Sequence, residues 1–148
     1  MNKAHFFDLG GTLLRLTADD QISVDTNGKV ELLPKVKSTL NDLREEAIFI
    51  VTNQSGIGSG LISLEDVFNW ITQIEEACEI SVEDYWACPT LDSPFRKPNP
   101  GMIVALADKH FISLADSIFV GDSESDFKAA KKAGIEEIYH SKEFFGKS

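Results

Sequence analysis

The chain has 148 residues, a formal net charge of −10 at pH 7, and 43% hydrophobic and 26% charged residues. This length and composition predict one globular domain over residues 1–148, without the apolar run of ~20 residues that a membrane protein needs to cross a bilayer. The acidic excess argues against a nucleic-acid partner, because phosphate backbones are bound by basic patches.

The first predicted element is a buried strand over 5–7, which ends on Asp8 and breaks at once into Gly10 and Gly11. The two glycines let the backbone approach a ligand closely. An aspartate at the carboxyl end of a central strand lies where open α/β sheets bind their ligands. By itself this pattern is also compatible with a plain turn.

Residues 13–33 are polar and poorly periodic, and Asn27-Gly28 is a turn signal between two short apolar runs. They predict a small hairpin or flap. Pro34 then opens a predicted helix, and its apolar face is formed by Val36, Leu40, Leu43 and Ala47.

Apolar runs over 48–51 and 117–120 predict two further buried strands, and 85–87 predicts a shorter one. The glycine- and serine-rich segment 54–62 predicts a loop, and a capping box at Ser63 predicts the start of the next helix. The apolar face of this helix is formed by Val67, Trp70, Ile71, Ile74 and Cys78.

Helices are also predicted over 101–110 and 123–133, the second ended by Gly134, and a last strand over 135–139. The aromatic pair Phe144-Phe145 is expected to pack the tail onto the core. Strands and helices alternate along the chain, which predicts an α/β fold, a three-layer Rossmann-like parallel sheet sandwich with right-handed crossovers.

Polar residues follow the predicted strands or stand in the proline-stiffened loop near residue 97. Carboxylates, a hydroxyl and a lysine are together the groups that hold Mg²⁺ and a phosphoryl group. In their order, these segments resemble the four motifs of the haloacid dehalogenase superfamily of phosphohydrolases, from residue 6 to about residue 134. The residues that carry the resemblance are Asp8, Thr52, Asn53, Arg96, Lys97, Asp122 and Asp126.

The resemblance implies a role for each carboxylate. Asp8 would be the catalytic nucleophile, forming an aspartyl-phosphate, and would bind Mg²⁺ together with Asp122 and the backbone carbonyl of Gly10. Asp126 would lie outside the metal's coordination shell and orient these ligands. The alternative is that Asp8 only caps the turn after its strand.

The resemblance also implies how the phosphoryl group is held. Thr52, Asn53 and Lys97 would bind its oxygens, and Thr52 and Lys97 would also act in catalysis. The planar guanidinium of Arg96 suits a two-point grip on a phosphate or carboxylate of the substrate. The alternative for Thr52 is that it merely ends a strand.

Within the superfamily, segments 52–58 and 96–102 are most similar to heptose-bisphosphate and histidinol-phosphate phosphatases, which lack a large cap domain. The interval 54–95 is too short for a cap, so we expect the haloacid dehalogenase fold without a large cap and an open site. Relatives often carry a zinc loop of cysteines and histidines, whereas segment 88–95 has one cysteine and no histidine, too few ligands for zinc.

A second departure concerns catalysis. The first motif of the superfamily is Asp-x-Asp, in which the second aspartate protonates the leaving oxygen and later activates water, but this chain has Gly10 there. General acid–base catalysis contributes typically about 10²–10⁴-fold. The sequence does not show which group, if any, replaces it.

The sequence therefore predicts a Mg²⁺-dependent phosphatase acting on a small phosphorylated metabolite, a sugar phosphate, through an aspartyl-phosphate. One alternative is a catalytically impaired phosphate-binding member of the superfamily, which Gly10 favours. Another is a polynucleotide end-phosphatase, which shares the Thr-Asn-Gln sequence at 52–54 but fits poorly with a net charge of −10. With only two cysteines and no signal-peptide pattern, we expect a cytoplasmic protein, and a monomer is the default.

Overall fold

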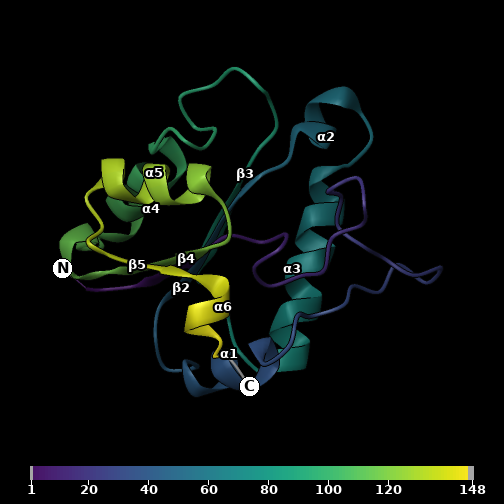
Figure 1. Cartoon of the computed structure of the whole chain (residues 1–148), viewed down its shortest axis with the longest axis horizontal. Helices are drawn as coiled ribbons and strands as arrows, with labels where there is room; N and C mark the ends of the chain where they lie inside the picture. Colours follow the sequence, from purple (N-terminus) through teal and green to yellow (C-terminus); the bar gives the residue numbers. More distant parts are fainter. Residues whose placement is uncertain (1, 147–148) are drawn as a thin grey trace.

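A computed structural model describes residues 2–146, and its centre is a five-stranded sheet in the order β3-β2-β1-β4-β5 (Figure 1). Every neighbouring pair of strands is parallel, as the alternation of strands and helices predicted. The strands are β1 (His5–Phe7), β2 (Ile48–Asn53), β3 (Asp84–Cys88), β4 (Ile118–Gly121) and β5 (Glu137–His140).

Helices cover both faces of this sheet, which gives the three predicted layers. Figure 1 shows α4 and α5 together on one face, and α1, α3 and α6 on the other. None of the helices in the described part of the chain has the length and apolar character needed to span a bilayer. The helices are α1 (Val36–Asp42), α2 (Ser55–Ser59), α3 (Leu64–Cys78), α4 (Gly101–His110), α5 (Glu124–Ala133) and α6 (Ser141–Phe144), with a 3-10 turn at Leu114–Asp116.

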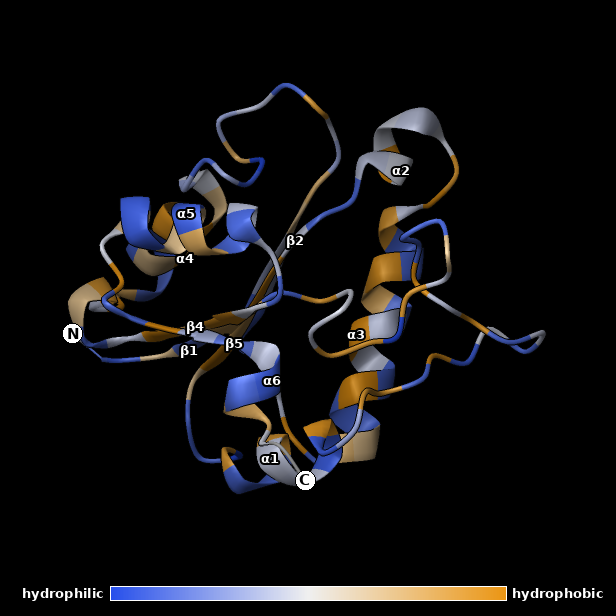
Figure 2. Ribbon diagram, in the orientation of Figure 1, coloured by the Kyte–Doolittle hydropathy of each residue, from blue (hydrophilic) through white to orange (hydrophobic). Residues whose placement is uncertain are grey.

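The core is divided by the sheet into two clusters, because successive side chains of a strand point to opposite faces. Phe7 and Val120 belong to the cluster under α1 and α3, whereas Phe6 and Phe119 belong to the cluster under α4 and α5. Both faces are thus buried, which explains why the central strands are continuous apolar runs. In Figure 2 the central strands of the sheet carry mainly hydrophobic colours, whereas α3 is banded with apolar and polar residues.

Helix α1 is shorter than its apolar pattern predicted. It ends at Asp42, so the prediction that Ala47 lies on its apolar face is wrong, whereas Leu43, the C-cap residue, packs against the same core cluster as Val36 and Leu40. The backbone N–H of His5 donates to the Ala47 carbonyl at 2.9 Å, so Ala47 already belongs to the edge of the sheet ladder. The chain becomes extended in order to enter β2, so the helix ends before the apolar pattern in the sequence does.

The segment predicted as a loop over 54–62 contains a short helix, α2, which was not expected. It ends at Ser59 and is followed by the C-cap residue Gly60, whose backbone is left-handed at φ 83°. The Gly58 N–H donates to the Pro89 carbonyl at 3.0 Å, and a Cβ at Gly58 would lie 2.3 Å from that oxygen. The glycine content therefore reflects a close backbone contact, and not only an irregular loop. Helix α6 was also not predicted.

Residues 13–33, here called the flap, leave the sheet after β1 and lie along α3 (Figure 1). Single antiparallel bridges join Leu16 to Ile22 and Val24 to Val30, without forming continuous strands. Gln73 of α3 anchors the flap, because its amide donates to the Gly28 carbonyl and accepts from the Val30 N–H, both at 2.9 Å.

Candidate active site

A cleft of about 450 Å³ opens at the carboxyl ends of β1, β2 and β4, where the strand order of the sheet reverses. This is the position at which open α/β sheets bind ligands. The structure brings together every residue that the sequence singled out for the site. Those lining the cleft are Asp8, Gly10, Thr52, Asn53, Arg96, Lys97, Asp122 and Asp126.

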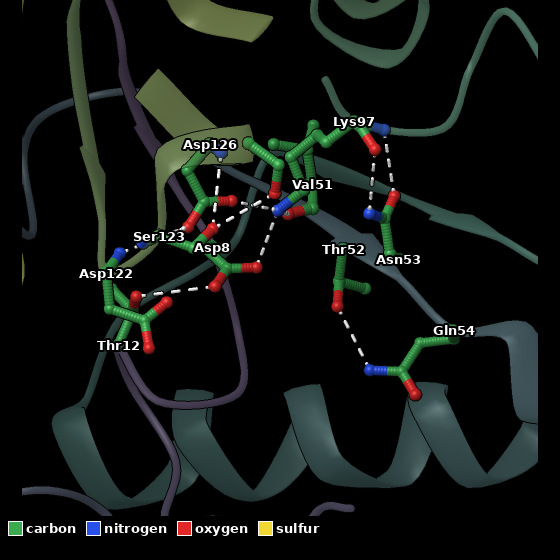
Figure 3. A network of polar contacts seen from close by, with 11 residues as sticks. Asp8, Thr12, Val51, Thr52, Asn53, Gln54, Lys97, Asp122, Ser123 and Asp126 are labelled. Carbon is green, nitrogen blue, oxygen red and sulfur yellow. Dashed lines mark hydrogen bonds and ion pairs between the residues drawn. The ribbon is translucent and has the colours of Figure 1, made fainter. Parts of the chain in front are cut away.

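The ammonium group of Lys97 is the centre of the site's polar network (Figure 3). It donates to Asp8 Oδ1 at 2.7 Å, to Asp126 Oδ1 at 2.6 Å and to the Val51 carbonyl at 3.1 Å. A lysine has three donors, and all are used. Because the Lys97 side chain is only 3% exposed, the ion pairs are shielded from water and hold the two carboxylates in fixed positions.

The loop that carries Lys97 is held by the side-chain amide of Asn53. Asn53 Oδ1 accepts from the Lys97 N–H at 3.0 Å, and Asn53 Nδ2 donates to the Lys97 carbonyl at 3.3 Å (Figure 3). This contact had no signal in the sequence. These contacts use the amide oxygen and one of the two N–H donors of Asn53, so its side chain is mainly engaged in holding the Lys97 loop.

Three carboxylates meet at the base of the cleft. One oxygen from each of Asp8, Asp122 and Asp126 lies within 4.8 Å of the others. Asp126 is fixed most firmly, because its Oδ2 accepts from the backbone N–H groups of Asp122 and Ser123 at 3.0 and 3.1 Å at the start of α5. Clustered carboxylate oxygens are the ligands that Mg²⁺ prefers, so these residues fit such an ion.

The cluster holds more negative charge than Lys97 can neutralise. Burial raises the pKa of Asp8 to about 7, and Asp126 and Asp122 add to this effect, while Lys97 opposes it. Burial likewise raises the pKa of Asp122. Burial also acts against the charged forms of Lys97 and Asp126. At Lys97 the charges of Asp8 and Asp126 outweigh burial and raise the pKa, and at Asp126 the charge and hydrogen bond of Lys97 outweigh it and lower the pKa. A bound cation would relieve this excess of carboxylates.

Two residues of the network were missed by the sequence analysis. Gln54 Nε2 donates to the hydroxyl oxygen of Thr52 at 3.0 Å, which leaves the hydroxyl proton of Thr52 free to donate into the cleft. Thr12 donates to Asp8 Oδ2 at 3.4 Å. Both follow a recognised motif residue in the sequence, but nothing in that sequence specified these side-chain contacts.

Arg96 brings a second positive charge to the cleft. Its Nη1 atom is buried and has no hydrogen-bond partner among residues 2–146. A buried guanidinium nitrogen without an acceptor is costly. The group is therefore well suited to an anionic acceptor supplied by a ligand.

The structure explains the glycines at positions 10 and 11 in different ways. Gly11 has a left-handed backbone at φ 80°, and a Cβ there would lie 2.2 Å from Asp122 Oδ2, so this glycine lets Asp122 approach. Gly10 has no such backbone constraint. A Cβ at Gly10 would instead lie 2.6 Å from Leu16 Cδ2 and 3.2 Å from Ile22 Cδ1. Apolar side chains of the flap thus occupy the space that the side chain of a larger residue 10 would need.

Comparisons with known proteins identify the family of this chain. The sequence model of the polynucleotide kinase 3 phosphatase family matches residues 3–144. The chain is 37% identical over 99 residues to D-glycero-alpha-D-manno-heptose-1,7-bisphosphate 7-phosphatase of Burkholderia mallei. This match covers 58% of this chain and 52% of that protein. The chain is 34% identical over 127 residues to D-glycero-beta-D-manno-heptose-1,7-bisphosphate 7-phosphatase of Rhodopseudomonas palustris, covering 76% of this chain and 71% of that protein. The chain thus spans between about half and seven tenths of these two relatives.

A solved structure is also similar. The D,D-heptose 1,7-bisphosphate phosphatase of B. bronchiseptica, complexed with magnesium and phosphate, superposes with a TM-score of 0.79 at 25% identity. The match covers 91% of this chain and 78% of that one.

Proposed function

The chain belongs to the polynucleotide kinase 3 phosphatase family within the haloacid dehalogenase superfamily, and from this membership we propose that it is a Mg²⁺-dependent phosphatase of a small phosphorylated metabolite, acting through an aspartyl-phosphate on Asp8. The observation that carries the proposal is the buried Lys97, which lies between Asp8 and Asp126 beside a third carboxylate, Asp122. Such a set is suited to phosphoryl transfer, which depends on positioning and on compensation of negative charge.

The metal would be held by Asp8, Asp122 and the Gly10 carbonyl. When bound, Mg²⁺ would offset the negative charge of the phosphoryl group during transfer. Asp126 remains engaged with Lys97 and with two backbone N–H groups, so it serves to fix the position of its neighbours.

The chain's own residues place the nucleophile. Lys97 holds Asp8 Oδ1, and Thr12 lies at the other oxygen, Oδ2. The backbone of Asp8 is fixed as well, because its N–H donates to the Val120 carbonyl of β4 at 3.0 Å. Attack by an Asp8 oxygen on phosphorus would form the new bond as the bond to the leaving oxygen breaks.

Two further groups would hold the phosphoryl oxygens. Thr52 has a hydroxyl proton available, because Gln54 occupies one acceptor position of its oxygen. The backbone N–H groups at the end of β2 would contribute as well. Arg96 is free to bind a second anionic group of the substrate through its buried Nη1.

The substrate class that best fits the cleft is a sugar phosphate. The interval between β2 and the Lys97 loop contains only α2, α3 and β3, too little for a cap domain, so the cleft is open to a polar metabolite. The curated relatives reported above are named as heptose-bisphosphate phosphatases. The guanidinium of Arg96, whose Nη1 has no partner in the described part of the chain, suits a substrate with a second phosphate. A monomer in the cytoplasm remains our expectation.

A second candidate is removal of a phosphate from the end of a polynucleotide, which the name of the family model favours. The net charge of −10 disfavours it, because polynucleotide binding requires positive charge along the backbone. A third candidate, phosphate binding without turnover, is favoured by Gly10.

One experiment separates these candidates. Phosphate release is measured from a panel of mono- and bisphosphorylated sugars and from a 3′-phosphorylated oligonucleotide, with Mg²⁺ or with a chelator, for the wild type and Asp8→Asn. We expect Mg²⁺-dependent release from a sugar phosphate that is lost in Asp8→Asn. Preference for the oligonucleotide would support the second candidate, and binding without release the third.

A further inference from the structure

Four carboxylates line the cleft, and one of them stands apart from the others. Asp8, Asp122 and Asp126 form the cluster at the base, whereas Asp20 comes from the flap. We propose that Asp20 supplies the general acid–base group that position 10 lacks. This inference rests on the proposed phosphatase function and names the residue that would protonate the leaving group.

The tip of the flap is a closed turn that presents Asp20. Thr17 accepts at its carbonyl from the Asp20 N–H at 3.0 Å, and its own N–H donates to the Gln21 carbonyl at 2.7 Å. The Thr17 hydroxyl accepts from the N–H groups of Asp19 and Gln21, both at 3.3 Å. Asp20 therefore has a defined backbone position, although it lies at an exposed tip.

The residues that flank this turn pack against position 10. The residues on either side of it, Leu16 and Ile22, pair with each other and are the same two that a Cβ at Gly10 would meet at 2.6 and 3.2 Å. Asp20 is two residues from Ile22, so their Cα atoms lie within about 7 Å. The flap thus fills the space at Gly10 with apolar groups and brings Asp20 to the lining of the same cleft.

The carboxylate of Asp20 is free to react. It makes no hydrogen bond or ion pair with any residue that the structure describes, and it is exposed to water at the mouth of the cleft. Asp126 cannot take this role, because it is 1% exposed and its oxygens are engaged by Lys97 and by backbone N–H groups. Asp8 and Asp122 are assigned to the nucleophile and the metal. Asp20 is the remaining carboxylate among the cleft-lining residues.

The chemistry balances with water as the second reactant. In the first step an Asp8 oxygen attacks phosphorus, the bond to the leaving oxygen breaks, and that oxygen takes its proton from the Asp20 carboxyl group. In the second step the Asp20 carboxylate takes a proton from water as the water oxygen attacks the aspartyl-phosphate. The bond between Asp8 and phosphorus breaks, inorganic phosphate leaves, and Asp20 is again protonated.

The test compares two neighbouring acidic residues of the same turn. Asp20 has a left-handed backbone at φ 59°, which asparagine adopts as readily as aspartate, so Asp20→Asn removes the carboxyl group with little effect on the fold. Asp19→Asn is the matched control, because Asp19 is exposed on the same turn but does not line the cleft. The substrates are β-glycerol phosphate, an alkyl phosphate with a poor leaving group, and p-nitrophenyl phosphate, whose leaving group needs no proton.

We expect Asp20→Asn to lower kcat/KM for β-glycerol phosphate by about 10²-fold or more and to change that for p-nitrophenyl phosphate much less. Phosphorylated enzyme should accumulate during turnover of the aryl substrate, because hydrolysis of the intermediate is slowed too. Asp19→Asn should behave as the wild type, and Asp20→Glu should recover part of the lost alkyl turnover.

A folded Asp20→Asn protein with an unchanged ratio of alkyl to aryl turnover would overturn the assignment, as would an equal loss in Asp19→Asn. If Asp8→Asn abolishes turnover while Asp20→Asn changes nothing, the phosphatase proposal stands and only the role of Asp20 fails. If the wild type hydrolyses neither substrate and carries no phosphoryl group on Asp8, both proposals fail.

Discussion

The Lys97 ammonium lies 2.7 Å from Asp8 Oδ1, although 89 residues separate them in the sequence. The same nitrogen lies 2.6 Å from Asp126 Oδ1. One buried cation therefore joins the loop before α4 to the carboxyl end of β1 and to the first turn of α5. Charge at the candidate active site and the packing of three chain segments therefore depend on the same side chain.

Replacing Lys97 should affect stability as well as activity. Lys97→Met leaves Asp8 and Asp126 buried without their cation, so we expect loss of phosphate release and a decrease of about 3–5 kcal/mol in the free energy of unfolding without Mg²⁺. Urea unfolding measures this decrease. Lys109→Met is the control, because its ion pair with Asp84 is exposed on the lysine side and should contribute about 1 kcal/mol or less. Equal effects of the two substitutions would contradict the buried network.

Asn53 should act by positioning Lys97. Asn53→Ala removes both hydrogen bonds to the Lys97 backbone, so we expect kcat to fall by about 10-fold or more while KM changes little. Steady-state kinetics with a generic aryl phosphate distinguishes the two effects. A large rise in KM with unchanged kcat would instead assign the Asn53 side chain to substrate binding.

Much of the fold could be predicted because local patterns specify it. The apolar run before Asp8 and the run before Asp122 each predict a buried strand, and parallel strands bring their carboxyl ends to one edge of a sheet. That is why residues far apart in sequence were correctly expected in one cleft. The short helix α2 was missed because its glycines indicate a loop when a close contact such as that between Gly58 and Pro89 is unknown.

The rest of the site depends on side-chain contacts that no local pattern encodes. The motif at Thr52 predicts that Asn53 binds phosphoryl oxygens. Its side-chain amide instead contacts the backbone N–H and carbonyl of Lys97, 44 residues away. Likewise, the flap's polar composition indicated a hairpin, but not that Leu16 and Ile22 would cover Gly10. The length predicted for α1 was wrong for a similar reason, since the sheet, and not the helix period, fixes the position of Ala47.

Restoring an aspartate at position 10 should require room in the flap. Gly10 has no left-handed backbone to forbid a side chain, but its Cβ would lie 2.6 Å from Leu16 Cδ2, the end of a flexible side chain. We therefore expect Gly10→Asp to lower the melting temperature, and Leu16→Ala to relieve part of this loss. In the Asp20→Asn background the combined change should raise alkyl phosphate turnover. An unchanged turnover in a folded, Mg²⁺-binding protein would contradict the functional equivalence of the two positions.

His5 should make stability depend on pH. Burial lowers its pKa below the ordinary value of 6.5, its Nδ1 has no partner within residues 2–146, and its ring stacks on Phe7. The unfolded chain therefore binds a proton at His5 more readily than the folded one, so the contribution of His5 to the free energy of unfolding should fall as the pH falls below about 6.5. His5→Phe should remove this part of the pH dependence. Urea unfolding of both proteins at several pH values measures it, and parallel curves would contradict the assignment.

Phosphorylation of Asp8 is the measurement that tests the central claim most directly. The protein is mixed with p-nitrophenyl phosphate and Mg²⁺, quenched in acid, reduced with borohydride to mark acyl phosphates, and mapped by peptide mass spectrometry. We predict a label on Asp8 that requires Mg²⁺ and is absent from Asp8→Asn. Release of phosphate that continues in a chelator and in Asp8→Asn, with no label on Asp8, would contradict the proposed mechanism.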